Sequence, residues 1–400
     1  MQARRRQETE RVFVPSHDRV KDQVKETVFR IIQRNNLMSQ KQILDSIKIR
    51  PTDLSNAIKE LLADRMILKE NASQERGRGR PEVFFRVNRR RLVCFALYVD
   101  SWTLRAAIVD MDGNLICPLQ RYVGGEVDAT GFLKAQQELT DELLKNVPDG
   151  SEVLGIGVSV PGSVDTSTLL WRESQRWQNI RDVDFNTLQA QTGMPVLLCR
   201  DLDSALANEL LANSKLKEEL VVLLHWGIGL GISFAYRGQI LQSNHGRFGT
   251  IGYTQFNPYA VDHIGENNME QHTSLRGLIR AIRYKYPTAK LDEREIAEIA
   301  AKDSFEDIPD VQIAIDHVGL ALRNLCAVLY PDRVLLLSPF AENELLVQKL
   351  QRSFTGGRLI ENLQTKIPLI PVSSGYRGCA VGSTYSLFEK GFERYLRARY

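Results

Sequence analysis

The 400-residue sequence lacks any apolar run that approaches the roughly 18 to 20 residues needed to span a bilayer. Its first residues include Arg4, Arg5 and Arg6 followed by polar side chains, and they lack the apolar core of a signal peptide. These two absences predict a cytoplasmic protein that has no membrane partner.

Cysteine is scarce as well. The five cysteines are odd in number, scattered and mostly embedded in apolar runs: Cys94, Cys117, Cys199, Cys326 and Cys379. This pattern predicts buried free thiols rather than disulfides or a redox pair. The composition, with 43% hydrophobic and 25% charged residues, is typical of a globular protein of two or three domains.

Positive charge is concentrated at the front of the chain. Residues 1–91 carry 22 Lys and Arg against 12 Asp and Glu, a net charge of +10, whereas the rest of the chain carries 30 against 37, a net charge of −7. A basic segment ahead of a mildly acidic body is typical of a polyanion-binding module joined to a second domain.

The basic segment contains the pattern of a helix-turn-helix. Apolar residues in phase between Val20 and Asn36 predict a first helix. Ser39 with Gln42 three residues later is a capping-box signature, so a second helix is expected to begin at Gln40. Pro51 suits the first turn of a third helix, which would be the DNA reader.

The apolar residues of this third helix repeat at helical spacing, which leaves its polar residues on the outer face. The residues predicted inside are Leu54, Ala57, Ile58, Leu61 and Leu62. The residues predicted to face the major groove of double-stranded DNA are Arg50, Thr52, Asp53, Ser55, Asn56 and Lys59.

Two strand-like runs, Met66–Glu70 and Val83–Val87, follow the reader and predict the hairpin of a winged helix. The tip of this wing contains Arg76, Arg78 and Arg80 among glycines. Glycine lets the backbone approach DNA closely, and guanidinium groups fit the narrow minor groove of A·T-rich DNA. The alternative is that this Arg/Gly loop is only a solvated linker.

The rest of the chain predicts an α/β fold with two lobes. A buried strand, a hairpin, a third strand and a helix run from Leu92 to Val147, and a further strand ends at Pro161 and Gly162. The same strand pattern begins again at Leu220, with a glycine turn at Gly227–Gly231. Such a duplication predicts a cleft between two lobes. Apolar residues at helical spacing from Val311 to Leu329 predict a helix whose apolar face is buried in the core.

Four further motifs carry a resemblance to a known family. They are Gly157–Asp165 (GVSVPGSVD), Asp201 within RDLDSA, the turn Gly227–Gly231 and Gly249–Tyr253 (GTIGY). With the wing, they make the chain similar, from Val20 to Phe388, to the ROK family of repressors, open reading frames and kinases, in particular its glucose- and N-acetylglucosamine-responsive repressors. The resemblance implies a winged-helix domain at 1–90 and an actin-like or hexokinase-like ATPase fold at 91–400. Lobe one is expected at about 91–202 plus the C-terminal helix, and lobe two at about 203–380.

The kinase elements of the family are altered here. Where family kinases hold phosphate with Asp-x-Gly-Gly-Thr, this chain has Asp100, Ser101 and the bulky Trp102, and the glycine-rich segment near the C-terminus reads Leu337–Phe340. Because phosphoryl transfer needs backbone donors that hold the triphosphate, we expect no enzyme activity, no catalytic residue and no cofactor. Asp201, which matches the catalytic base, is expected to accept a sugar hydroxyl instead.

The family's metal and sugar positions are altered too. The zinc-binding His matches Tyr253, and the cysteine-rich segment matches Asp262–Met269, which has no cysteine, so we expect no metal. His245, His263 and His272 lie nearby without zinc-binding spacing. The sugar-binding Glu residues match Thr250 and Gln271, and the Asn before the catalytic Asp is Arg200, whose charge suggests an acidic or phosphorylated sugar. The predicted ligand site is Pro161, Gly162, Arg200, Asp201, Thr250, Tyr253 and Gln271.

These observations predict a sequence-specific transcriptional regulator, a repressor of sugar-utilisation genes. It is expected to bind a double-stranded DNA operator as a homodimer or homotetramer, because one winged helix reads only a half-site. A sugar or sugar-phosphate effector in the cleft is expected to change lobe closure. Two alternatives stay open: a ROK-type sugar kinase with a DNA-binding head, and a regulator that is controlled by a partner protein.

Overall fold

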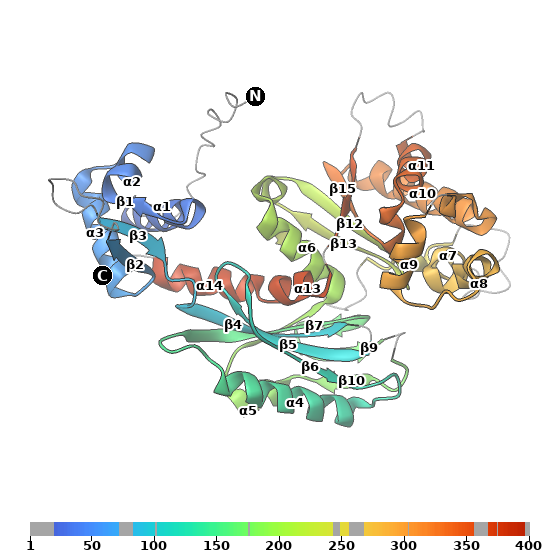
Figure 1. Cartoon of the computed structure of the whole chain (residues 1–400), viewed down its shortest axis with the longest axis horizontal. Coiled ribbons are helices and arrows are strands. Elements are labelled where there is room, and N and C mark those ends of the chain that lie inside the picture. The colour runs from blue at the N-terminus through green and yellow to red at the C-terminus, as the bar shows by residue number, and fades with distance from the viewer. Residues whose placement is uncertain are drawn as a thin grey trace.

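The chain folds into a small N-terminal head, two larger lobes and a pair of C-terminal helices that run between them (Figure 1). The computed structural model describes residues 20–71, 83–100, 102–174, 177–242, 249–255, 268–302, 304–355, 367–373 and 375–396. The name head is used for residues 20–90, lobe one for 91–200 and lobe two for 201–372.

The head is the predicted winged helix. Its sheet has the strand order β1-β3-β2, and β2 pairs antiparallel with β3. Ser39 and Gln42 form both bonds of the capping box at the start of α2, and Pro51 is in the first turn of α3, as predicted. The elements are α1 (Val20–Asn35), β1 (Met38–Ser39), α2 (Gln40–Ser46), α3 (Pro51–Ala63), β2 (Ile67–Asn71) and β3 (Val83–Val87).

A buried lysine ties α1 to the end of α3. The side chain of Lys25 is 2% exposed, and its Nζ lies 2.9 Å from Asp64 Oδ2 and 3.3 Å from Glu60 Oε2. Both carboxylates belong to the last turn of the reader or its cap, so this ion pair fixes where the reader ends relative to α1.

Lobe one is built on a five-stranded sheet with the order β11-β7-β4-β5-β6. Helices α4 and α5 cover one face, while the C-terminal helix α13 (Gly375–Ser383) covers the other through Ala380 and Val381. A small three-stranded sheet, β8-β9-β10, was not predicted. The elements are β4 (Leu92–Asp100), β5 (Thr103–Asp110), β6 (Leu115–Tyr122), α4 (Ala129–Lys145), β7 (Glu152–Val160), β8 (Ser163–Asp165), β9 (Leu170–Glu173), β10 (Arg181–Asp184), α5 (Asn186–Thr192) and β11 (Val196–Arg200).

Lobe two repeats this sheet in the order β14-β13-β12-β15-β16, with an antiparallel meander and two parallel strands in the same relation. The predicted duplication is therefore confirmed. The elements are α6 (Asp201–Ala212), η1 (Ser214–Glu218), β12 (Leu220–Trp226), β13 (Leu230–Tyr236), β14 (Gln239–Ile240), η2 (Ile251–Tyr253), α7 (Met269–Thr273), α8 (Leu275–Lys285), α9 (Glu293–Ala300), η4 (Phe305–Asp307), α10 (Pro309–Leu329), β15 (Arg333–Leu337), η5 (Pro339–Glu342), α11 (Glu344–Thr355) and β16 (Leu369–Val372).

Helix α10 departs from one expectation, because it is long and apolar enough to cross a membrane by length and composition alone. Its Val311, Ile315 and Val318 are nevertheless buried in the core of lobe two, where the apolar stripe was predicted. A core helix of a globular domain meets the same criterion of length and composition.

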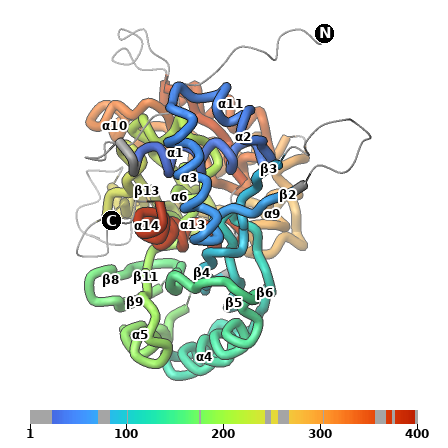
Figure 2. The backbone as a smooth tube through the Cα atoms, turned by 90° about the vertical axis from the view of Figure 1, so that its left-hand side faces the viewer, coloured from blue at the N-terminus to red at the C-terminus, as the bar shows by residue number. Residues whose placement is uncertain are grey.

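The C-terminal helices α13 (Gly375–Ser383) and α14 (Tyr385–Leu396) lie end to end, in red, between the head and the centre of the molecule (Figure 1). Turned by 90°, helix α1 of the head lies next to α14 (Figure 2). All five cysteines are free thiols, as predicted, and Cys94 and Cys326 are buried. Cys117, Cys199 and Cys379 are only partly buried, which corrects the expectation of buried thiols at these positions.

Candidate functional site: a reading head and an interlobe cleft

The outer face of α3 is polar and exposed. Its Leu54, Ala57, Ile58 and Leu61 are buried, and the six predicted reader residues are all exposed: Arg50, Thr52, Asp53, Ser55, Asn56 and Lys59. Arg50 is the N-cap residue and its side chain makes no capping bond. The face therefore offers amide, hydroxyl, carboxylate and cationic groups, which are the groups that hydrogen-bond base edges and phosphates.

One of these six residues is already engaged. Gln40 Nε2 donates to Ser55 Oγ at 2.9 Å, and that hydroxyl donates back to the carbonyl of Pro51 at 2.9 Å. Ser55 therefore links α2 to the first turn of α3. Gln40 was not among the predicted site residues, although its place at the start of α2 puts it beside the reader.

The predicted wing is present as the antiparallel pair β2 and β3, with Ile67 opposite Val87 and Asn71 opposite Val83. Its tip, with Arg76, Arg78 and Arg80, lies outside the described residues. The minor-groove role of these three residues stays a prediction.

A cleft of about 380 Å³ lies between the lobes, where several strands end. Pro161 and Gly162 follow β7, Arg200 ends β11 and Asp201 follows it, and His225 lies near the end of β12. Ligands of α/β sheets bind at such carboxyl ends of strands. Thr250 and Tyr253 line the opposite wall, so six of the seven predicted ligand residues border one cavity.

The seventh residue, Gln271, is exposed and does not line this cleft, whereas its neighbour Glu270 does. The difference has a helical cause. Asn268 caps α7 by accepting from Gln271 N, which sets the phase of the helix so that adjacent residues 270 and 271 point in different directions. Glu270 is therefore the acidic group that the sequence reasoning missed by one position.

Arg200 lines the cleft, but its charge is already paired. Its Nε and Nη2 lie 3.1 and 2.7 Å from the two carboxylate oxygens of Asp203, and both side chains are buried. Burial disfavours the charged form of Arg200, but Asp203 and Asp201 outweigh it and raise the pKa of the guanidinium. This pairing weakens the sequence argument for an acidic or phosphorylated sugar, because the guanidinium is compensated from within the chain.

The glycine turn at Gly227–Gly231 is occupied by carboxylates of the chain itself. The amide of Ile228 donates to Glu293 Oε1 at 2.7 Å, and the amide of Leu230 donates to Glu270 Oε2 at 3.0 Å. His225 Nε2 lies 3.3 Å from the same Glu293 oxygen. Two amides of the turn are thus bonded to carboxylates, and a carboxylate at this position also repels a phosphate.

The bulky side chains of the two altered kinase segments, Trp102 and Phe340, pack against aromatic rings of the chain. Trp102 stacks on Trp177 with ring centroids 6.2 Å apart and is not part of the cleft lining. Phe340 is buried in the core of lobe two against Trp226. The loss of phosphate binding at Asp100, Ser101 and Trp102 stays a prediction.

Within the part of the chain that the structure describes, no group of three or more His, Cys, Asp or Glu side chains could hold a metal ion. His272 is exposed, whereas His245, His263 and most of Asp262–Met269 lie outside that part. The expected absence of zinc stays a prediction.

The structure defines a two-lobed α/β protein that has a cleft between the lobes and a winged-helix head. Comparison with known proteins identifies its family. Residues 105–389 match the ROK family, so the chain belongs to that family.

Three relatives show how far the likeness extends. The xylose repressor of Bacillus subtilis (strain 168) is 19% identical over 357 residues, which cover 88% of this chain and 91% of the repressor. The crystal structure of a ROK family transcriptional regulator, a homolog of the E. coli MLC protein, covers 94% of this chain and 99% of its own with a TM-score of 0.73 and 16% identity. A ROK hexokinase from Thermus thermophilus covers 75% of this chain and 99% of its own with a TM-score of 0.58 and 21% identity.

Proposed function

We propose that this protein is a sequence-specific DNA-binding transcriptional regulator that represses sugar-utilisation genes in the cytoplasm. The observation that carries the proposal is the exposed polar face of α3 on a winged-helix head joined to a ROK body. The name of the similar xylose repressor supports the link to sugar. Because one head reads one half-site, we propose a homodimer or homotetramer on the operator. We also propose the domain division at residues 90 and 91.

We assign base reading to residues whose side chains are not bonded to the head. Asn56 suits a bidentate contact with adenine, and Asp53 suits the exocyclic amine of cytosine. Lys59 and Arg50 suit phosphates or guanine. Ser55, whose hydroxyl is held by Gln40, has a smaller part in reading.

A matched pair of lysine variants tests the DNA function. The probe is a set of duplexes selected from a random pool by the wild-type protein. Lys59→Ala is expected to weaken binding and to reduce the slope of log K against log salt by about one. Lys134→Ala removes the same charge from the exposed face of α4 in lobe one and is expected to leave binding unchanged. Failure of the wild-type protein to select any duplex would refute the proposal.

We propose that the effector is a neutral sugar. The cleft offers the carboxylates of Asp201 and Glu270, which accept hydrogen bonds from hydroxyl groups, while the charge of Arg200 is compensated by Asp203. Calorimetric titration with xylose, glucose, N-acetylglucosamine and glucose 6-phosphate tests this. Tighter binding of the phosphate than of every neutral sugar contradicts the proposal.

A regulatory protein is the second candidate effector. A ligand that binds the folded state at a hundred times its Kd raises stability by about 2.7 kcal/mol, so a sugar effector is expected to raise the melting temperature clearly. If no sugar in a broad panel changes the melting temperature, the cleft does not sense sugar, and control by a partner protein is favoured.

We also propose that the chain does not phosphorylate sugar. The support is the pair of carboxylates on the glycine turn, because Glu293 and Glu270 take the amides of Ile228 and Leu230. The measurement is ATP turnover by purified protein with the same sugars. Sugar-dependent hydrolysis above the rate of an Asp201→Asn variant would contradict this proposal.

A further inference from the structure

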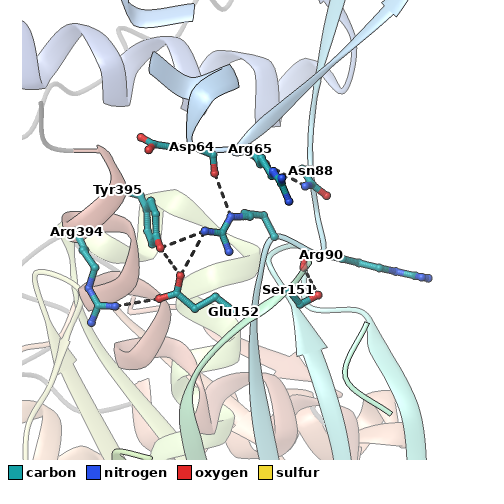
Figure 3. Close-up of polar contacts among 9 residues, drawn as sticks. Asp64, Arg65, Asn88, Arg90, Ser151, Glu152, Arg394 and Tyr395 are labelled. Carbon is teal, nitrogen blue, oxygen red and sulfur yellow. Dashed lines mark hydrogen bonds and ion pairs between the residues drawn. The ribbon is translucent and has the colours of Figure 1, made fainter. Parts of the chain in front are cut away.

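The connection between the head and lobe one is built from ordered contacts. The carbonyl of Arg89 accepts from Met111 N at 3.1 Å, and its side chain bonds Asn36 in the head and Asp112 in lobe one. Ser151 Oγ donates to the carbonyl of Arg90 at 2.6 Å (Figure 3). Arg89 and Arg90, the first two of three consecutive arginines, therefore hold the head and lobe one together.

Arg91 reaches the end of the reading helix. Its Nε donates to the carbonyl of Asp64 at 3.0 Å, and Asp64 is the C-cap residue of α3. A cation at this end of a helix is favoured by the helix dipole. The backbone carbonyl of Arg91 accepts from Glu152 N at 2.9 Å, so Arg91 is also fixed to strand β7 of lobe one.

The last turn of α14 completes this cluster. Tyr395 Oη donates to Glu152 Oε2 and accepts from Arg91 Nη2 at 3.2 Å. Arg394 Nη1 lies 3.0 Å from the other oxygen of Glu152, and Figure 3 shows both α14 side chains directed at this carboxylate. The Arg91 guanidinium also lies 5.2 Å from the centre of the Tyr395 ring. The carboxylate of Glu152 in lobe one thus contacts both Arg91, which bonds the end of α3, and the last turn of α14.

An apolar core joins α14 to the head as well. The rings of Phe29 in α1 and Phe392 in α14 lie 5.7 Å apart, and the guanidinium of Arg30 lies over Phe392 at 4.8 Å. Phe392, Tyr395 and Leu396 belong to the same buried cluster as the core of the head. Rotating the head away from α14 would expose these side chains to water.

The other end of this helix pair leads to the cleft. Helix α13 sits so close to α6 that a Cβ on Gly382 would lie 1.7 Å from the carbonyl of Ser204. Cys379 Sγ donates to the carbonyl of Asp201 at 3.7 Å, and Asp201 lines the cleft. Helix α6 itself rests on the sheet of lobe two, whereas α13 rests on the sheet of lobe one. The contact of α6 with α13 is therefore where the two lobes meet.

We infer that Tyr395, Glu152 and Arg91 are positioning residues that fix the angle of the reading head, so that head, lobe one and α13–α14 turn as one body against lobe two. This inference rests on the proposed function, because the consequence is a defined spacing between the two heads of an oligomer. A ligand that moves lobe two across the cleft changes this spacing through α6 and α13 without any change inside the head.

The test compares two conservative variants with a control. Tyr395→Phe keeps the buried ring and removes only the hydroxyl, and Glu152→Gln keeps the size of the side chain and removes its charge. Arg121→Gln is the control, since its ion pair with Glu138 is a surface pair of lobe one outside this cluster. Each full-length protein is titrated with the selected duplex, with single half-sites and with duplexes whose half-sites are respaced.

Both variants are expected to bind the selected spacing about tenfold more weakly and to lose spacing preference, while single half-site affinity stays within about twofold of wild type. Loss of half-site affinity to the same extent would mean that the residues only stabilise the head, and the inference would fall. Hydrogen exchange is the second readout, with faster exchange expected at residues 88–92 and 392–396 only in the two variants. Unchanged exchange and spacing preference also overturn the inference. A wild-type protein that selects no duplex instead refutes the proposed function.

Discussion

The buried ion pair between Arg200 and Asp203 allows a quantitative prediction at the cleft. Asp203 is 3% exposed, and its carboxylate accepts from the Arg200 guanidinium and, at 2.6 Å, from Ser233 Oγ. Asp203→Asn keeps an oxygen for Ser233 but leaves the guanidinium charge without its neutralising partner. Removing one partner of a buried pair costs about 3 to 5 kcal/mol.

The lower end of this range applies here, because Arg200 keeps a bond to the carbonyl of Ile232 and lies near Asp201. We expect Asp203→Asn to lower the free energy of unfolding by about 3 kcal/mol. This corresponds to a fall in Tm of roughly 6 to 12 °C for a domain of this size. Scanning calorimetry measures the fall directly.

The matched control is the double variant Arg200→Gln with Asp203→Asn, which replaces both charges by neutral hydrogen-bonding groups. It is expected to recover to within about 1.5 kcal/mol of wild type. Asp203→Asn is also expected to bind glucose 6-phosphate more tightly relative to glucose, because it uncovers the positive charge. The reasoning is wrong if the single variant loses less than about 1 kcal/mol or if the double variant is less stable than the single one.

Three further predictions concern stability. Ser39→Ala removes the side-chain half of the capping box and is expected to cost about 1 kcal/mol in urea unfolding, whereas Ser46→Ala at the other end of α2 costs less than about 0.5. Gly382→Ala would place Cβ 1.7 Å from Ser204 O and is expected to prevent native packing of α13 on α6. Gly193→Ala has open space around it and is expected to cost only about 1 kcal/mol, because its backbone is left-handed. Comparing the melting temperatures of the two variants tests this difference. Burial raises the pKa of the Cys199 thiol from 9.0 to about 12. As the pH rises, the thiol of the unfolded chain therefore ionises first. The stability contributed by the neutral folded thiol is present below pH 9.0 and is lost as the pH rises toward 12. Cys199→Ser is therefore expected to lose less stability between about pH 8 and about pH 10 than wild type, and an equal loss in both proteins contradicts the assignment.

The predictable parts of this molecule are those with local signals. The capping box at Ser39, the Pro51 start of the reader and the apolar phase of α3 each depend on residues within a few positions of one another, and all three are confirmed. The duplicated sheet was predictable because its strands repeat in the same order.

The cleft was harder to predict. The segment before α7 lacks the cysteines of the family, so the sequence does not fix which residue of α7 faces the cavity. The predicted residue was Gln271, whereas Glu270 lines the cavity. The pairing of Arg200 with Asp203 could have been read from their i, i+3 spacing at the start of α6. That signal was available, and it removes the main reason for expecting an anionic ligand.

The docking of α14 on the head had no local signal at all. Phe29 and Phe392 are separated by most of the chain, and nothing in either sequence neighbourhood specifies the other. The run of three arginines at 89–91 carries no sequence signal for these contacts either, although the structure has Arg91 bound to Asp64 and Tyr395.

The carboxylates of Glu293 and Glu270 at the glycine turn have a consequence for engineering this protein. Installing glycine and threonine beside Asp100 would rebuild one loop of a kinase, yet Glu293 would still hold the amide of Ile228 and the imidazole of His225. A triphosphate brought to this turn would have to compete with that carboxylate for the amide of Ile228. A laboratory selection for new phosphotransfer activity should therefore randomise positions 293 and 270 together, because their two carboxylates bond the amides of Ile228 and Leu230 in the same turn.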